Sequence, residues 1–82
     1  MTPTVTLYGR PGCHLCDDAR ATLERIRRDT PFALHEVDIT NDDALHSRYL
    51  ERIPVIEVDG DEAFELLVDE LELNRYLARV QG

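Results

Sequence analysis

Two cysteines separated by two residues, Cys13 and Cys16, are the residues of this sequence best suited to chemistry. They follow a β-type run at residues 4–8 and a turn at residues 9–12, and they begin a segment with helical spacing. The first N–H groups of a helix lack partners within it, and the helix dipole places partial positive charge there. A thiolate on Cys13 would therefore be stabilised, and a thiolate is the nucleophile of disulfide exchange.

The composition is that of a single small globular domain. The chain has 82 residues, of which 43% are hydrophobic and 32% are charged. A chain of this length buries roughly 60–65% of its unfolded surface, which leaves room for one domain, residues 1–82, and for no second one. We therefore expect an ordered monomer rather than a disordered chain.

The charge balance is strongly acidic. The formal net charge is −8 at pH 7, which argues against nucleic acid as a partner. Residues 53–74 include no basic residue, and the acids there are Glu57, Asp59, Asp61, Glu62, Glu65, Asp69, Glu70 and Glu72. We interpret this stretch as a solvated acidic face, with a docking surface for a basic partner as the alternative.

The N-terminal sequence does not have the form of a targeting segment, and no apolar run approaches membrane-spanning length. We therefore expect a cytoplasmic protein without a membrane partner. In a reducing compartment a cysteine pair rarely forms a permanent structural disulfide, and the loop between Cys13 and Cys16 is too short to constrain the unfolded chain much. Redox chemistry and metal binding remain as the possible roles of the cysteine pair.

The segment after the cysteines predicts an amphipathic helix that ends at the Thr-Pro pair of residues 30–31. Its apolar positions at helical spacing are Leu15, Ala19, Leu23 and Ile26. Residues 32–37 then have the composition of a second strand. A strand, a helix and a strand in succession favour a βαβ unit with parallel strands.

A second helix is expected after this unit. Thr40, with Asp43 three residues later, resembles a weak capping box for a helix that must end before Pro54. Residues 55–58 then predict a third strand.

The remaining sequence predicts a hairpin and a final helix. The Asp59-Gly60 pair indicates a tight turn, so residues 63–67 should return antiparallel to the third strand. Asp69 is expected to cap the last helix. Its apolar positions are Leu71, Leu73, Tyr76, Leu77 and Val80. The predicted order is βαβαββα.

This order and three sequence segments resemble the glutaredoxins of the thioredoxin-fold superfamily. Residues 8–13 are similar to the aromatic, basic and Pro-Gly lead into the family's first cysteine, residues 37–39 to the end of its second strand, and residues 53–55 to its Val-Pro segment. The resemblance spans residues 5–77. It implies an α/β thioredoxin-like (glutaredoxin) fold with a four-stranded mixed sheet flanked by helices on both faces.

The resemblance also implies a role for each cysteine. Cys13 would attack a disulfide and Cys16 would resolve the mixed disulfide, an order that fits an exposed helix end for Cys13 and a less accessible place one turn later for Cys16. Arg10 and His14 would add to the stabilisation of the Cys13 thiolate. The acids after the second cysteine, Asp17 and Asp18, oppose this effect; we expect the helix dipole and Arg10 to prevail.

Substrate-binding residues follow from the resemblance as well. They are Tyr8, Arg10, Arg52, Ile53, Pro54 and Asp69. The Ile53-Pro54 bond is expected to be cis, which would place the proline beside the cysteines and free the Ile53 backbone for an extended substrate. A helix stop or a strand start would explain Pro54 without a cis bond.

The sequence departs from the family where glutathione binds. Leu66-Leu67-Val68 stands where glutathione-binding glutaredoxins usually have Gly-Gly, although Asp69 follows near the expected place. Bulky side chains and clustered acids weaken the capture of an anionic tripeptide, while Arg52 could add a carboxylate contact. We expect no bound cofactor, with glutathione as a candidate co-substrate.

Metal binding is the alternative chemistry. A CxxC pair is half of a tetrahedral zinc site, but His35 and His46 lie apart from it and no second ligand cluster is evident, so no metal is expected. An iron–sulfur cluster shared across a dimer would need glutathione as a ligand.

The sequence thus predicts a thiol-disulfide oxidoreductase acting on a disulfide-containing protein or a small thiol substrate, and reduced by glutathione or a thioredoxin-type reductase. The alternative is a non-enzymatic thioredoxin-fold binding module that holds a partner or such a cluster.

Overall fold

The computed structural model describes residues 2–81, and its elements follow the predicted order. The elements are β1 (Thr4–Gly9), α1 (His14–Asp29), β2 (Ala33–Asp38), the 3-10 turn η1 (Ile39–Asn41), α2 (Asp43–Tyr49), β3 (Val55–Val58), β4 (Asp61–Glu65) and α3 (Glu70–Gln81). None of the helices in this part of the chain is both long and apolar enough to cross a membrane.

The four strands form one mixed sheet in the order β2-β1-β3-β4. β1 pairs with β2 in parallel, and β3 runs antiparallel to both β1 and β4. This is the four-stranded mixed sheet expected from the sequence. Because β1 has a neighbour on each side, the cysteine-bearing loop leaves from the middle of the sheet, between β2 and β3.

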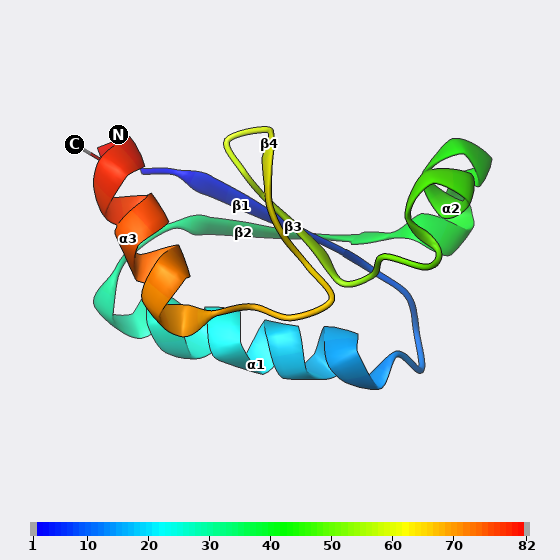
Figure 1. Cartoon of the computed structure of the whole chain (residues 1–82), viewed down its shortest axis with the longest axis horizontal. Coiled ribbons are helices and arrows are strands. Elements are labelled where there is room, and N and C mark those ends of the chain that lie inside the picture. Colours follow the sequence, from blue (N-terminus) through cyan, green and yellow to red (C-terminus); the bar gives the residue numbers. More distant parts are fainter. Residues whose placement is uncertain (1, 82) are drawn as a thin grey trace.

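The main core lies between the sheet and the helices α1 and α3, which run along the same side of it (Figure 1). Alternate residues of a strand face opposite sides of a sheet, so Val5 and Leu7 of β1 point to this core together. The other buried members are Ala19, Leu23, Ile26, Phe32, Ile56, Val58, Leu73 and Leu77. Full burial of one such leucine or valine stabilises the fold by about 1.5–3 kcal/mol.

A second cluster lies at the cysteine end of the sheet. Tyr8 of β1 packs against Tyr49 of α2, with ring centroids 5.0 Å apart. Since Tyr8 follows Leu7 in the strand, this contact lies on the face opposite α1 and α3, so helices flank both faces. The buried members of this cluster are Cys16, Ile39, Tyr49, Ile53 and Val55.

The cap of α2 differs from the sequence prediction. Asp42, and not Thr40, is the N-cap, and its carboxylate accepts hydrogen bonds from the N–H groups of Ala44 and Leu45 at 2.9 and 3.1 Å. Thr40 lies in η1 and donates its N–H and its hydroxyl to Asp38, which lowers the pKa of that carboxyl. The extra turn shifts the start of α2 by two residues, and a capping-box pattern cannot reveal it.

The fourth strand also differs from its prediction, because it runs from Asp61 to Glu65 rather than over residues 63–67. The strand ends where Leu66 adopts a left-handed backbone conformation with φ +69°. That conformation costs a residue other than glycine about 1–2 kcal/mol. Three expected core positions are exposed: Leu15 at 42%, Leu71 at 62% and Val80 at 42%.

Close packing between β1 and α1 makes Gly9 necessary. A Cβ atom on Gly9 would lie 2.9 Å from the Cys16 Sγ and 3.2 Å from the Cys16 Cβ. Both residues are buried, so neither can move into solvent. The bare backbone of Gly9 therefore lets the first turn of α1 approach the sheet.

We expect Gly9→Ala to lower the free energy of unfolding by about 1–3 kcal/mol, because the added methyl overpacks this contact. Urea denaturation of the reduced protein measures the loss. In a Cys16→Ala background the same substitution should cost much less, since the sulfur is gone. Equal losses in the two backgrounds would contradict the assigned contact.

Asp42→Ala is expected to destabilise the protein by about 1 kcal/mol, because two N–H groups of α2 lose their acceptor. Thr40→Ala is the matched control and should cost less than about 0.5 kcal/mol, since its bonds are exposed. Urea midpoints of the two variants decide the point. A larger loss for Thr40→Ala would restore the capping box read from the sequence.

Candidate functional site

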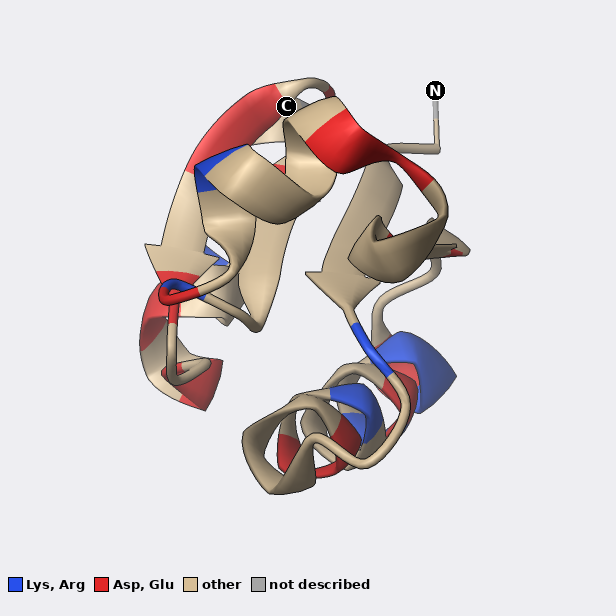
Figure 2. Cartoon of the chain, turned by 90° about the vertical axis from the view of Figure 1, so that its right-hand side faces the viewer, with Lys and Arg blue, Asp and Glu red and all other residues tan. Residues whose placement is uncertain are grey.

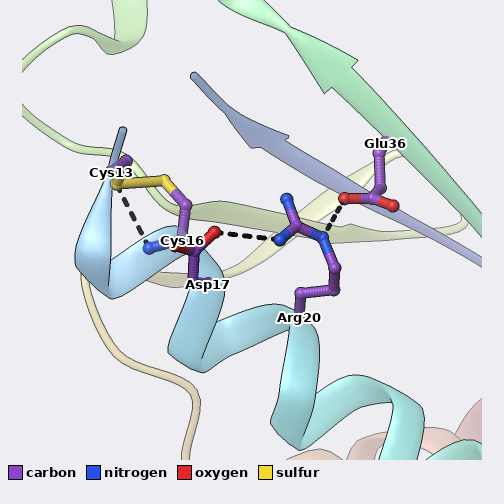
Figure 3. The surroundings of a disulfide bond; sticks show 5 residues. All are labelled: Cys13, Cys16, Asp17, Arg20 and Glu36. Atoms are coloured by element: carbon purple, nitrogen blue, oxygen red, sulfur yellow. Dashed lines mark hydrogen bonds and ion pairs between the residues drawn. A yellow bond between two sulfur atoms is a disulfide. The ribbon is translucent and has the colours of Figure 1, made fainter. Parts of the chain in front are cut away.

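The cysteine pair lies at the start of α1, where Cys13 is the N-cap residue. The Cys16 N–H donates a hydrogen bond to the Cys13 Sγ at 3.1 Å, as Figure 3 shows. The two sulfurs form a disulfide, with the Cα atoms 5.2 Å apart. The sulfur of Cys13 thus takes the place of the oxygen that a serine or aspartate cap would supply, at the positive end of the helix dipole.

The two cysteines differ in accessibility. Cys13 is half-buried, while Cys16 is 1% exposed and packs among apolar side chains, including Ile39 and Ile53. An incoming reagent therefore reaches Cys13 more easily than Cys16. The lower accessibility of Cys16 is as expected from the sequence, although Cys13 is half-buried rather than exposed; the order in which the two cysteines react stays a prediction.

An ion-pair bridge beside the cysteines was not foreseen from the sequence. Arg20 of α1 pairs with Asp17 at 2.9 Å and reaches across to Glu36 of β2 (Figure 3). The i,i+3 spacing of Asp17 and Arg20 is a signal that could have predicted the first contact, whereas the second depends on how α1 lies over the sheet. Because Arg20 faces Asp17, it partly neutralises an acid close to the cysteines.

A cavity of about 330 Å³ opens next to this bridge. It lies between the first turns of α1 and the ends of β1 and β2, and Cys16 forms part of its wall. Its lining residues are Leu7, Gly9, Arg10, Pro11, Cys16, Asp17, Arg20, Glu36, Val37 and Asp38. Cys13 is not among them, so the cavity lies to one side of the Cys13 sulfur.

The proposed tuning residues both lie beside the pair. Arg10 is exposed, and its carbonyl oxygen accepts the Cys13 N–H at 3.4 Å. Its guanidinium makes no ion pair within residues 2–81. His14 is exposed as the first residue of α1, and Asp18 points to solvent.

The Ile53-Pro54 peptide bond is cis, as the resemblance led us to expect. Its neighbours limit how an extended substrate could pair here. The Ile53 N–H already donates to the Tyr49 carbonyl at 3.0 Å, and the Pro54 carbonyl accepts the Leu66 N–H at 2.8 Å. The carbonyl of Ile53 is therefore the group left for main-chain pairing, and its N–H is not.

Tyr8 is anchored by its hydroxyl, which donates to a Glu57 carboxylate oxygen at 2.9 Å. Burial, together with this bond and the nearby negative charge, raises the pKa of Tyr8 to about 12. The phenol therefore stays protonated at neutral pH. The ring lies against Tyr49 and packs with the cluster that holds Cys16, which places Tyr8 next to the cysteines.

Two further predicted binding residues are held by contacts within the protein. Arg52 pairs with Glu62 and Glu65 of β4, and its guanidinium lies over the Tyr49 ring, 5.4 Å from the centroid. Asp69 accepts the Glu72 N–H at 3.1 Å and so caps α3. A substrate carboxylate at Arg52 would have to compete with two acids, and its role in binding stays a prediction.

Possible metal ligands do not converge in the described part of the chain. His35 is exposed on β2 and His46 is half-buried on α2. Among residues 2–81, no group of three histidine, cysteine or acidic side chains is arranged to hold a metal ion.

Known structures share this architecture. The protein Ne2328 of Nitrosomonas europaea, solved by NMR, superimposes with a TM-score of 0.82 at 27% identity, over 93% of this chain and 92% of that one. The protein XcR50 of X. campestris gives a TM-score of 0.76 at 37% identity, over 92% and 96%. A thioredoxin of Halobacterium salinarum, 21% identical, gives 0.72 over 98% and 75%, which shows a shared thioredoxin fold.

The sequence comparisons agree with the structural ones. The uncharacterized protein Rv0508 of Mycobacterium tuberculosis is 29% identical over an alignment that covers 94% of this chain and 84% of that protein. Residues 4–78 match the model of the glutaredoxin-like domain family (DUF836). The chain therefore belongs to the glutaredoxin-like domain family, with a thioredoxin fold and a CxxC pair at disulfide distance.

Proposed function

We propose that this protein is a dithiol oxidoreductase that reduces disulfides. The Cys13 thiolate attacks one sulfur of a substrate disulfide and bonds to it, and the other substrate sulfur leaves as a thiolate. Cys16 then attacks the Cys13 sulfur, which releases the second substrate thiol and forms the Cys13–Cys16 disulfide. Two molecules of glutathione, which leave as oxidised glutathione, or the dithiol of a thioredoxin-type reductase supply the two electrons that restore the pair.

The observation that carries this proposal is the hydrogen bond from the Cys16 N–H to the Cys13 sulfur at the N-cap of α1. A donor and a helix dipole directed at one sulfur favour its ionised form. Each unit by which the thiol pKa falls corresponds to about 1.4 kcal/mol in favour of the thiolate. The burial of Cys16 beside it supports the second role, because a resolving thiol must be close and protected.

Arg10 and His14 tune the reaction in this proposal. Both lie at the exposed entrance to α1, where positive charge stabilises a thiolate. Asp17 opposes them less than its position would imply, because it is paired with Arg20. Pro54 and Ile53 form the wall of the substrate site next to Cys16.

The wider setting is proposed with the reaction. The protein acts as a monomer in the cytoplasm and holds no bound cofactor, so the external reductant acts as a co-substrate. A reducing compartment supplies electrons to a CxxC pair and leaves few stable disulfides to compete for it.

We expect Cys13→Ser to abolish exchange and Cys16→Ser to trap a mixed disulfide, because the second step then lacks its nucleophile. Incubation of each variant with oxidised glutathione, followed by intact-mass measurement, detects the adduct. The Cys16→Ser protein should gain one glutathione on Cys13. The double variant Cys13→Ser with Cys16→Ser is the control and should gain none.

Exchange that survives in Cys13→Ser would overturn the assigned roles. A wild-type protein that neither reacts with disulfides nor forms an adduct would point instead to the binding module considered above. Visible absorbance after anaerobic purification with glutathione would then test for a shared iron–sulfur cluster.

Arg10→Gln should slow the reaction of the reduced protein with a small disulfide about 1.4- to fivefold at low salt, the effect of about 0.2–1 kcal/mol typical of exposed charges. The small disulfide is 5,5′-dithiobis(2-nitrobenzoate), and the stopped-flow absorbance of the thionitrobenzoate that it releases measures the rate. Arg28→Gln, at the far end of α1, removes the same charge and should change the rate little. Equal losses would show a general charge effect and no local role for Arg10.

A further inference from the structure

The loop between β4 and α3 exposes several leucines. Leu66 is 45% exposed and Leu67 is 71% exposed, and Leu71 in the first turn of α3 is 62% exposed. We call Leu66, Leu67 and Leu71 the leucine surface. Apolar side chains at this level of exposure gain free energy when another molecule covers them.

The leucine surface is held in place, and it is held near the cysteines. The Leu66 N–H donates to the Pro54 carbonyl at 2.8 Å, and the Leu67 N–H donates to the backbone carbonyl of Glu65 at 2.8 Å. Val68 packs against the main core and anchors the other end of the loop. Ile53, which precedes Pro54 in the cis peptide bond, packs in the cluster that holds Cys16. A molecule bound by its sulfur to Cys13 therefore lies within reach of the loop.

The conformation of Leu66 sets the direction of the loop. Its φ of +69° lies in the left-handed region, which glycine adopts freely and leucine does not. The chain keeps a bulky side chain where a small one would fit the backbone better. This choice of residue is explained if the side chain contributes to binding.

The charge around the loop favours a cationic partner. Glu65 pairs with Arg52 and Glu70 pairs with Arg25, whereas Asp69 makes no ion pair in the described part of the chain. The whole chain carries a net charge of −8. In the view of Figure 2, acidic ribbon segments are spread over several elements of the molecule. Such a field attracts basic segments and repels anions.

We propose that the leucine surface docks an extended polypeptide that has apolar residues next to its cysteine and basic residues farther along. The inference rests on the proposed function and names its substrate class. The peptide's disulfide reacts with Cys13 while its apolar side chains cover Leu66 and Leu67. Oxidised glutathione lacks apolar side chains and is anionic, so it is a poorer substrate than such a peptide.

The test uses short synthetic peptides, each with one cysteine linked to thionitrobenzoate. One set has leucine on both sides of the cysteine and the other has serine, and each is made with two lysines or with two glutamates. Attack on the peptide sulfur releases thionitrobenzoate, which is followed by stopped-flow absorbance. The reduced wild-type protein should react about tenfold faster with the leucine–lysine peptide than with the serine–glutamate peptide.

Two variants locate the effect. In Leu66→Gly with Leu67→Ser, the ratio of rates for leucine and serine peptides should fall to below about twofold, because the apolar contact is lost. The glycine suits the backbone at this position, so the variant should fold, and circular dichroism checks this. Leu50→Ser is the control: it removes a leucine that is 42% exposed at the end of α2 and should keep the wild-type ratio.

The outcomes distinguish a failure of the docking surface from a failure of the proposed function. A wild-type protein that reacts with all four peptides at the same rate, or a loop variant that keeps the full preference, would overturn the docking surface and leave the proposed function standing. A wild-type protein that releases no thionitrobenzoate from any peptide or from the free aromatic disulfide would overturn the proposed function and this inference with it.

Discussion

The hydrogen bond from the Cys16 N–H to the Cys13 sulfur joins the fold of this protein to its proposed chemistry. It exists because β1 ends in the middle of the sheet and the chain turns directly into α1. Gly9 allows the first turn of that helix to lie against the strand. The buried leucine and isoleucine positions of α1, with α3 beside it, then fix the helix on the sheet. The Cys13 sulfur is thus positioned by β1 on one side and α1 on the other.

The electrostatics of the site contrast with those of the chain. The protein carries a net charge of −8, yet the sulfur lies at the positive end of a helix with Arg10 exposed nearby. Arg20 pairs with both Asp17 and Glu36, so the acid closest to Cys16 in the sequence is partly neutralised. Acidic residues are concentrated instead in β4 and in the first turn of α3.

Much of the fold could be predicted because local signals agreed. The Asp59-Gly60 turn, the helical spacing of Ala19, Leu23 and Ile26, and the CxxC segment each indicated the observed element. The prediction that Leu15 is buried was wrong: it fits the helical spacing but lies in the first turn of α1 and is 42% exposed. The cap of α2 was misplaced because an unforeseen 3-10 turn comes before it.

The features that sequence could not give are contacts between distant segments. The pairing of Arg20 with Glu36 depends on how far α1 advances along β2. Likewise, the Ile53 N–H donates to the Tyr49 carbonyl, so the carbonyl of Ile53 is its backbone group left for main-chain pairing, which the motif alone did not reveal. The bond between Leu66 and Pro54 brings the leucines beside the cis proline, and it follows from the register of the hairpin.

The account depends most directly on the ionisation of Cys13 in the reduced protein. The rate at which iodoacetamide alkylates the Cys16→Ser variant, measured from pH 4 to pH 10, gives the pKa of the remaining thiol. The account predicts a value below the ordinary cysteine pKa of about 8.5, because the helix end and Arg10 stabilise the thiolate. A value at or above that reference would contradict it and would show that the neighbouring acids outweigh the helix.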